Sequence, residues 1–445
     1  MRTSLALALV LLLDASPAVA EKASEAELLE RIEQLELRLR DLETQGSDAS
    51  SGGAASPGGG WARRLRLGGS ANTGFYGGDA NSVHDPSSFL VWDARFFVDA
   101  DLGENVSVGE TTIFRNVAFS FEWNLMRLGR LFNDVGELYA DFQGLLSQDA
   151  LNFQLGRFQI PVGEAYLRYS QGYAAKPFVS STVGGPWFWD EGIRFYGRDD
   201  EYGVGYVSSI SDGDTPFNAD SDGDKQVTLK LFWEPWSWLH VSASGLRSGR
   251  LGSSSEAASG ALWLGETWAR SLGSGSGVPV YQDGVEVPNG PNRLDDTWLA
   301  AGDAILDFED RARVWLAYGR YAMNAAGDSS YDRVLHYWIA ETLLRGAWLS
   351  ETLRPFYLGL RANALGTYDD GEGYLVDFRQ GGSLGYNVEA LTAYSAVLGW
   401  ELNQNLRLRA EYTHNDIDLV RGVTQSMRNA AKKADTFGVE VGASF

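Results

Sequence analysis

Phe437-Gly-Val-Glu-Val-Gly-Ala-Ser-Phe445, the last nine residues of the chain, is the stretch that decides the fold. Alternate residues of a β-strand point to opposite faces, so one face here is apolar and the other carries glycine, glutamate and serine. The apolar face consists of Phe437, Val439, Val441, Ala443 and Phe445. A final strand of this kind, ending on an aromatic residue, is typical of the closing strand of an outer-membrane β-barrel. There the apolar face contacts lipid and the polar face contacts a lumen.

The same period of two recurs along the chain from Trp61 onward. It is clearest in Trp92–Leu102, Leu138–Phe142, Val227–Trp233 and Leu406–Tyr412. The strand-like segments are about nine to twelve residues long, which suits a tilted strand that crosses a membrane. Strands of a soluble β-sandwich also alternate, but they are usually shorter. Single-chain bacterial barrels use even strand numbers, so residues 61–445 are predicted to form an all-β, transmembrane antiparallel β-barrel of about 16 strands.

Short and long connections alternate between these strands. Short turns are predicted at 103–105, 234–237, 307–310 and 403–405, and long loops at 161–190, 211–225, 271–295, 366–385 and 415–433. Short periplasmic turns opposite long external loops are the asymmetry expected of a bacterial barrel. Trp236 and Trp238, beside a short turn, are expected at the membrane interface.

The first residues predict export. Residues 1–20 combine Arg2, an apolar run from Leu5 to Leu13 and the small-residue site Ala18-Val-Ala20, which together are typical of a secretory signal peptide. The apolar run is too short to span a bilayer, so an uncleaved anchor is disfavoured. We therefore place the mature protein in the outer membrane of a Gram-negative bacterium, with lipid and lipopolysaccharide as its surroundings.

Residues 21–45 predict a short α-helical coiled coil before the barrel. Apolar residues recur at alternating spacings of four and three, at Leu28, Ile32, Leu35, Leu39 and Leu42. Such a seam indicates self-association in a periplasmic stalk, although a solvated amphipathic spacer would carry the same pattern. Residues 46–60 are rich in Gly, Ser and Ala, which predicts a flexible linker.

Composition and motifs argue against several other classes of function. The chain has no cysteine and a formal charge of −22, which disfavours disulfides, thiolate chemistry and a nucleic-acid partner. No HExxH, Gly-x-Ser-x-Gly, Walker or dinucleotide motif occurs, so neither an enzyme nor a cofactor is expected. Asp220–Asp224 resembles a calcium loop, but Lys225 and Leu231 replace its required Gly and Glu, so no metal site is predicted.

Residues 150–197 carry a family resemblance. A strand ending in Gly156-Arg157-Phe158-Gln-Ile-Pro161 is followed by a long loop and a returning strand that starts Glu191-Gly192. This arrangement resembles the phosphate-selective porin O/P family. The resemblance implies a 16-stranded trimeric barrel whose third external loop folds inward and narrows the pore.

The loop 161–190 also predicts an unusual position on physical grounds. Pro161 removes a backbone donor and ends strand pairing. Phe178, Trp187, Phe188 and Trp189 are too apolar for a freely solvated loop, so an inward-folded constriction is expected. Its polar residues Glu164, Arg168, Lys176, Asp190 and Glu191 would then face the aqueous path. A loop packed against a neighbouring subunit at the barrel mouth is the alternative.

The predicted lumen carries equal numbers of acids and bases. The inward bases are Arg95, Arg194, Arg198, Lys230, Arg361, Arg407 and Arg409, and the inward acids are Asp93, Asp99, Asp101, Glu122, Glu137, Asp141 and Glu411. A pore that selects anions needs convergent cationic groups, so this balance predicts no clear preference. A register slip by one residue would change the count.

These patterns predict a trimeric porin for passive diffusion of small hydrophilic solutes or ions, with anions such as phosphate among the candidates. Two alternatives stay open. One is a structural barrel whose lumen is plugged by the loop 161–190. The other is a channel with a specific site for one anion or sugar.

Overall fold

The computed structural model describes most of the predicted barrel and none of the segments before it. The described residues are 64–79, 87–127, 130–148, 150–164, 176–180, 182, 189–213, 223–248, 270–271, 281–282, 285–286, 294–309, 311–325, 333–367, 374–377, 385–419 and 433–445. The predicted signal peptide (1–20), stalk (21–45) and linker (46–60) lie outside them. Arg66–Ser444 form one compact unit.

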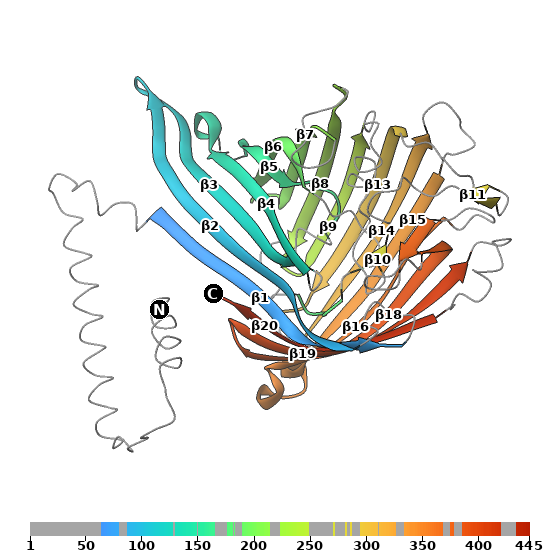
Figure 1. The fold of residues 1–445 in the computed structure, drawn as a ribbon. Helices are drawn as coiled ribbons and strands as arrows, with labels where there is room; N and C mark the ends of the chain where they lie inside the picture. Colours follow the sequence, from blue (N-terminus) through green and yellow to red (C-terminus); the bar gives the residue numbers. More distant parts are fainter. Residues whose placement is uncertain are drawn as a thin grey trace, which may run out of the picture. The chain divides into compact units, whose positions relative to one another are not determined.

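One antiparallel sheet of 18 strands dominates this unit, and the strands lie side by side around a barrel (Figure 1). Two of them, β10 (Arg270–Ser271) and β17 (Tyr374–Asp377), are short and pair with each other, which leaves 16 long strands. These are β1 (Leu65–Gly78), β2 (Ser88–Val108), β3 (Thr111–Arg127), β4 (Arg130–Gln143), β5 (Asn152–Gln159), β6 (Trp189–Asp199), β7 (Val204–Ser211), β8 (Gln226–Trp236), β9 (Leu239–Ser248), β13 (Leu294–Asp307), β14 (Ala312–Ala325), β15 (Arg333–Arg345), β16 (Phe356–Gly366), β18 (Gly385–Asn403), β19 (Leu406–Leu419) and β20 (Lys433–Ser444).

The first and last strands close the barrel. β1 pairs with β20, with Ser70 opposite Ser444 and Phe75 opposite Val439. Closure leaves no free sheet edge, which is the condition for a sheet to cross a bilayer. The predicted closed barrel of about 16 strands is therefore confirmed. A separate two-stranded sheet joins β11 (Tyr281–Gln282) and β12 (Val285–Glu286).

The connections alternate in length as predicted, with one correction. β8 and β9, β13 and β14, and β18 and β19 are joined by short turns, whereas β5 and β6 or β19 and β20 are joined by long connections. The turn expected at 103–105 lies further along, because β2 continues to Val108 and turns at Gly109-Glu110. Register shifts between Asp101 and Gly103 allow the strand to continue, and Gly109 adopts the positive φ (65°) that the turn requires.

The outer wall is apolar, and the final strand shows the predicted division of faces. Phe437 and Val439 are 42% and 46% exposed, whereas Glu440, the residue after Val439, is buried in the interior. Beside the short turns, Trp236 stacks on Trp238 (centroids 5.0 Å apart) and Phe356 stacks on Trp400 (5.5 Å). Within the described residues, no helix has the length and apolar character needed to span a membrane.

The inner wall is not uniformly polar. Along β2–β9 it carries buried polar side chains, including Asn124, Gln154, Ser209, Thr228 and Ser244. Along β13–β18 it is largely apolar, with Leu299, Trp315, Tyr321, Leu335, Tyr337, Leu365, Leu391 and Val397 all buried. Alternation alone predicts a polar inner face, so this apolar half is a finding of the tertiary structure. Apolar side chains there need an apolar covering, because water would not solvate them favourably.

Candidate functional site

The connection after β5 leaves the wall at its first residues. Ile160 and Val162 are buried, and Pro161 between them has no N–H to continue the strand ladder. Gly163 adopts a left-handed φ of 68°, which turns the chain further from the wall. Residues 161–164 therefore run inside the barrel, as the sequence predicts for the start of the loop.

Residues 161–164, the first arm of the connection, are attached to β8 and β9 by a first anchor. Lys230 Nζ donates to the carbonyl of Gly163 (3.0 Å), and the Gly163 N–H donates to Ser244 Oγ (3.0 Å). The Glu164 carboxylate forms an ion pair with Lys230 and accepts from Ser242 Oγ (3.0 Å). His240 Nε2 lies 2.7 Å from the same carboxylate. The backbone of Gly163 and the Glu164 carboxylate thus have wall partners, which satisfy these polar groups in the interior.

The ionised form of Glu164 is favoured in this setting. Burial raises the pKa of Glu164, but the His240 hydrogen bond and the charge of Lys230 outweigh it and lower that pKa to about 2. A lowered carboxyl pKa contributes stability at ordinary pH, and this stability is lost progressively as the pH falls from the ordinary carboxyl value of 4.5 through about 2. His240 Nδ1 also lies 2.7 Å from Glu234, so donating to both carboxylates requires the doubly protonated ring.

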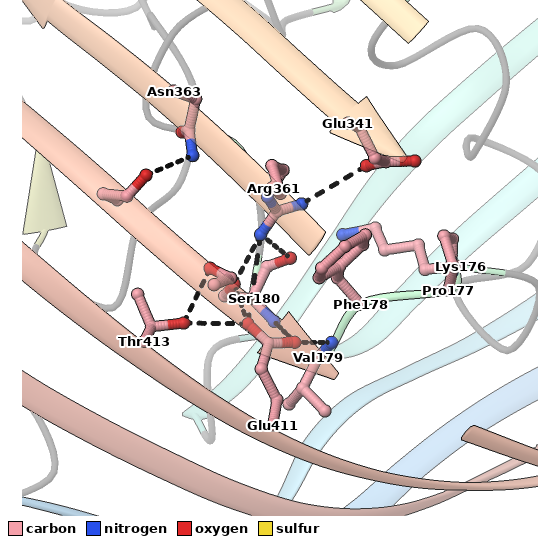
Figure 2. Close-up of polar contacts among 12 residues, drawn as sticks. Lys176, Pro177, Phe178, Val179, Ser180, Glu341, Arg361, Asn363, Glu411 and Thr413 are labelled. Carbon is pink, nitrogen blue, oxygen red and sulfur yellow. Dashed lines mark hydrogen bonds and ion pairs between the residues drawn. The ribbon is translucent and has the colours of Figure 1, made fainter. Parts of the chain in front are cut away.

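A second anchor holds residues 176–180 through their backbone (Figure 2). Arg409 donates to the carbonyls of Lys176 and Phe178, and Arg407 donates to that of Lys176 (3.0 Å). The remaining contacts are Tyr357 Oη to Pro177 O (2.7 Å), Arg361 Nη2 to Ser180 O (2.9 Å), and Val179 N and Ser180 N to Glu411 Oε2 (2.5 and 3.2 Å). The segment is therefore bound to the wall mainly through its backbone carbonyls and N–H groups.

Phe178 adds an apolar contact to this anchor. Its buried ring packs against Leu343, Tyr357 and Val397 of the inner wall. The Arg361 guanidinium lies 4.3 Å from the ring centroid. Figure 2 shows the two side chains next to each other. A desolvated cation–π contact of this kind contributes about 2 kcal/mol. The Phe178 ring thus packs between the Arg361 guanidinium on one side and apolar wall residues on the other.

The strand from which the connection starts, β5, and the strand that its residues 176–180 contact, β16, lie on opposite sides of the barrel. In the strand order β5-β6-β7-β8-β9-β13-β14-β15-β16, β16 is eight steps from β5, and closure through β20 and β1 also gives eight. The chain that leaves β5 therefore reaches the strand diametrically opposite. The described parts of the connection contact two separate parts of the inner wall, residues 161–164 at β8 and β9 and residues 176–180 at β16 and β19.

The predicted constriction residues divide into three groups. Glu164 and Lys176 lie in the anchored arm, whereas Arg168 lies outside the described residues. Asp190 is buried at the start of β6, where it accepts from the backbone N–H of Glu191 (2.9 Å) and Gly213 (2.8 Å). Its contacts fix the returning strand.

Glu191 corrects the prediction, because it does not face the lumen. It shares a face with the exposed Ile193 and Phe195 of β6, and alternation therefore directs it outward. Its carboxylate pairs with Arg157 Nη1 (2.9 Å), and Arg157 Nε donates to the carbonyl of Gly136 (2.8 Å). Arg157, whose direction the sequence leaves open, is buried beneath this pair, with its side chain 2% exposed.

Six of the predicted lumen bases are engaged with protein partners in the interior, whereas Arg198 is half exposed at the end of β6, where it pairs with Asp200 and Glu234. Arg361, Arg407, Arg409 and Lys230 hold the connection, as described above. Arg95 pairs with Asp93 (3.2 Å) and Glu122 (2.6 Å), and Arg194 Nε donates to Gln154 (2.7 Å). Asp141 accepts from Tyr196 Oη (2.8 Å). These charged side chains therefore bind other groups of the inner wall or the connection after β5.

Sequence reasoning missed several partners of the second anchor. Tyr357, Ser180, Glu341 and Glu440 were not predicted, although Glu440 is visible in the sequence as the single acid on the polar face of the last strand. It forms an ion pair with Arg409. Glu440 lies directly opposite Arg409 of the neighbouring strand β19, so a correct prediction of the strand register would have identified this pair.

The comparisons with known proteins bear on the fold. No family model matches the chain, and no curated protein matches it in sequence. Three similar solved structures are OprB of Pseudomonas putida (TM-score 0.52, 10% identity), an anion-selective porin from Comamonas acidovorans (0.51, 11%) and the outer-membrane channel DcaP of Acinetobacter baumannii (0.51, 13%). Each similarity covers 86% of this chain, and 95%, 99% and 97% of those chains respectively. At these identities the similarity establishes a common barrel fold.

Gly399 offers a test of the second anchor from the wall side. A Cβ at Gly399 would lie 2.0 Å from Tyr357 Cζ, and Tyr357 cannot yield freely because it binds Pro177. Gly399→Ala is expected to lower the free energy of unfolding by about 1–3 kcal/mol, the usual cost of overpacking. Urea titration of the folded barrel measures this. Gly245→Ala is the matched control, since its Cβ would lie 3.8 Å from the nearest atom, Leu299 O. Equal stability of the two variants would contradict the clamp.

Proposed function

We propose that this chain is an outer-membrane porin for passive diffusion of small hydrophilic solutes or ions. The observation that carries the proposal is the connection after β5, whose residues 161–164 contact β8 and whose residues 176–180 contact β16, the strand eight steps from β5. A chain segment across a barrel of this size narrows the lumen and brings charged side chains to the narrow point.

The outer wall supports the membrane location. Its apolar side chains, such as Leu229, Leu231 and Leu398, are about half exposed and encircle the barrel, as lipid contact requires. Stacked tryptophans beside the short turns suit a membrane interface. The solved structures of similar fold include proteins described as a porin and an outer-membrane channel. The surroundings of the barrel would be outer-membrane lipid and lipopolysaccharide, with residues 21–45 in the periplasm.

A plugged structural barrel is the second candidate, and the burial of the inner wall favours it. Leu335, Leu365 and Leu391 face inward and have no measurable exposure. A wide aqueous pore would leave such side chains in water, at a cost of about 25 cal/mol for each Å² of apolar surface. The burial of these side chains therefore supports a lumen that is filled beside β13–β18.

Selective transport of phosphate has weaker support. An anion site needs cationic groups whose charge is not already matched by carboxylates and carbonyls of the protein. Arg361, Arg409 and Lys230 are buried and bind carboxylates and loop carbonyls. Diffusion without a dedicated phosphate site is therefore the proposal that fits the inner wall.

Single-channel conductance of the purified, folded protein in a planar bilayer tests the proposal. Steady open-channel currents in salt solution are the expected result, and currents in groups of three would support a trimer. Block by phosphate at low concentration would restore the phosphate-selective reading. Silence from folded protein would move the plugged barrel to first place.

The proposed trimer rests on the seam of residues 21–45, and its prediction concerns assembly alone. Leu35→Asp and Leu39→Asp combined place two charges in the apolar seam, so association of the stalk is expected to weaken. Native gel mobility and crosslinking of the full chain measure this, with Leu35→Ile and Leu39→Ile combined as the control. Conductance per pore should be unchanged. An altered conductance in the Asp variant would contradict a stalk that is independent of the pore.

A further inference from the structure

The inner face of β2–β4 carries an excess of acids. Its carboxylates are Asp93, Asp99, Asp101, Glu122, Glu137 and Asp141, and the bases that interact with them are Arg66, Arg95 and Arg194. Acids outnumber these bases two to one. The contacts join neighbouring strands, since Ser120 of β3 donates to Asp99 of β2 (2.7 Å). The acids thus form one continuous strip, named here the acidic wall.

The opposite wall does not compensate for this charge. Arg409 pairs with Glu440, and Arg407 with Glu401 (2.7 Å). Arg361 lies 3.9 Å from Glu341 and 4.0 Å from Glu411. The same arginines also bind the carbonyls of residues 176–180. Their charge is therefore matched locally by carboxylates and peptide dipoles, so the field across the lumen is set by the acidic wall.

A polar side chain beside the acidic wall points to where a cation would bind. Asn124 of β3 is 1% exposed, and within the described residues neither atom of its side-chain amide has a hydrogen-bond partner. Gly136 of β4 packs closely against it and leaves no room for a side chain. A Cβ there would lie 2.8 Å from both Asn124 Nδ2 and Glu122 Oε2, so these two side chains are neighbours. The unpartnered amide oxygen of Asn124 and the Glu122 carboxylate are the kinds of oxygen ligand that a small cation prefers.

We infer that this barrel conducts cations in preference to anions, along the acidic wall and past Glu122 and Asn124. The inference deepens the proposed porin function and rests on it. A like-signed lining concentrates counter-ions and excludes co-ions, so the wall determines the sign of the conducted ion. The solutes that suit this passage are small monovalent cations, including protonated amines.

The reversal potential under a potassium chloride gradient tests the inference on the full, folded chain. The unmodified protein should give the potential of a cation-preferring pore. Neutralising the wall with Glu122→Gln and Asp141→Asn combined should lower the potassium-to-chloride permeability ratio by on the order of tenfold. Asp418→Asn is the matched control, because Asp418 shares the outward face of β19 with the exposed Tyr412. It should leave the ratio unchanged.

The outcomes separate this inference from the porin proposal. An open pore that prefers anions, or a ratio unaffected by neutralising the wall, would overturn the cation preference alone. Silence from folded protein would overturn the porin function and the cation preference with it. The sign measured on the unmodified chain decides the matter even where the double variant does not fold.

Discussion

Replacing Glu411 with alanine is expected to release residues 176–180 from the wall of the barrel. The Glu411 carboxylate accepts from the backbone N–H groups of Val179 and Ser180 and from the Ser180 hydroxyl, and it lies 4.0 Å from Arg361. Its loss leaves a buried guanidinium short of a counter-charge, which costs about 3–5 kcal/mol. Each buried N–H left without an acceptor costs about 1–3 kcal/mol more.

Hydrogen exchange of the Val179 and Ser180 amides measures this release. An opening that becomes easier by about 3 kcal/mol speeds exchange by roughly a hundredfold, since each 1.4 kcal/mol is a factor of ten. Glu401→Ala is the control, because Glu401 also pairs with an inner arginine but its side chain is 47% exposed. An exposed pair contributes about 1 kcal/mol at most. Protection of both amides retained in Glu411→Ala would show that other contacts hold the segment.

Deleting residues 165–188 is expected to increase single-channel conductance several-fold. The deletion removes the chain that reaches from β5 to β16 and β19, including Phe178 and the backbone bound by Arg361 and Arg409. A wider aqueous cross-section then carries more current. The freed arginines and glutamates would be hydrated rather than buried, so the barrel should tolerate the loss. The first anchor at Glu164 remains in place.

The same deletion decides between the two candidate functions. Removing residues 215–221 from the connection between β7 and β8 serves as the control for shortening an external loop. If the intact chain conducts and the 165–188 deletion conducts more, the connection narrows an open pore. If the intact chain is silent and the deletion opens it, the connection is a plug. Conductance equal to that of the control would mean that residues 165–188 do not obstruct the lumen at all.

The barrel itself could be predicted because its determinants are local. In β20, alternation alone assigned Phe437 and Val439 to the outside and Glu440 to the inside, and the structure agrees. Pro161 marked the point where the chain leaves the wall, since a residue without an N–H ends a ladder wherever it stands. The apolar character of Phe178 indicated a buried loop before any partner was known.

The candidate site could be predicted only in part, because its contacts join distant strands. Arg361 and Arg409 were identified as inward, but their carboxylate and loop partners depend on which strands face each other after closure. Glu191 was misplaced because the sequence around the loop does not fix the register in which β6 returns. A slip of one residue exchanges the two faces, so register decides the role of a charged residue.

Local patterns in the amino-acid sequence were enough to predict the strands, the faces of the final strand and the alternation of short and long connections. These follow from the period of two and from turn residues, which act over a few positions. The three-dimensional arrangement was needed to see that the inner wall is polar along β2–β9 and largely apolar along β13–β18, and that residues 176–180 contact the wall opposite β5. Closure brings β5 and β16 to opposite sides of one lumen, and no local pattern encodes which side chains then meet across it.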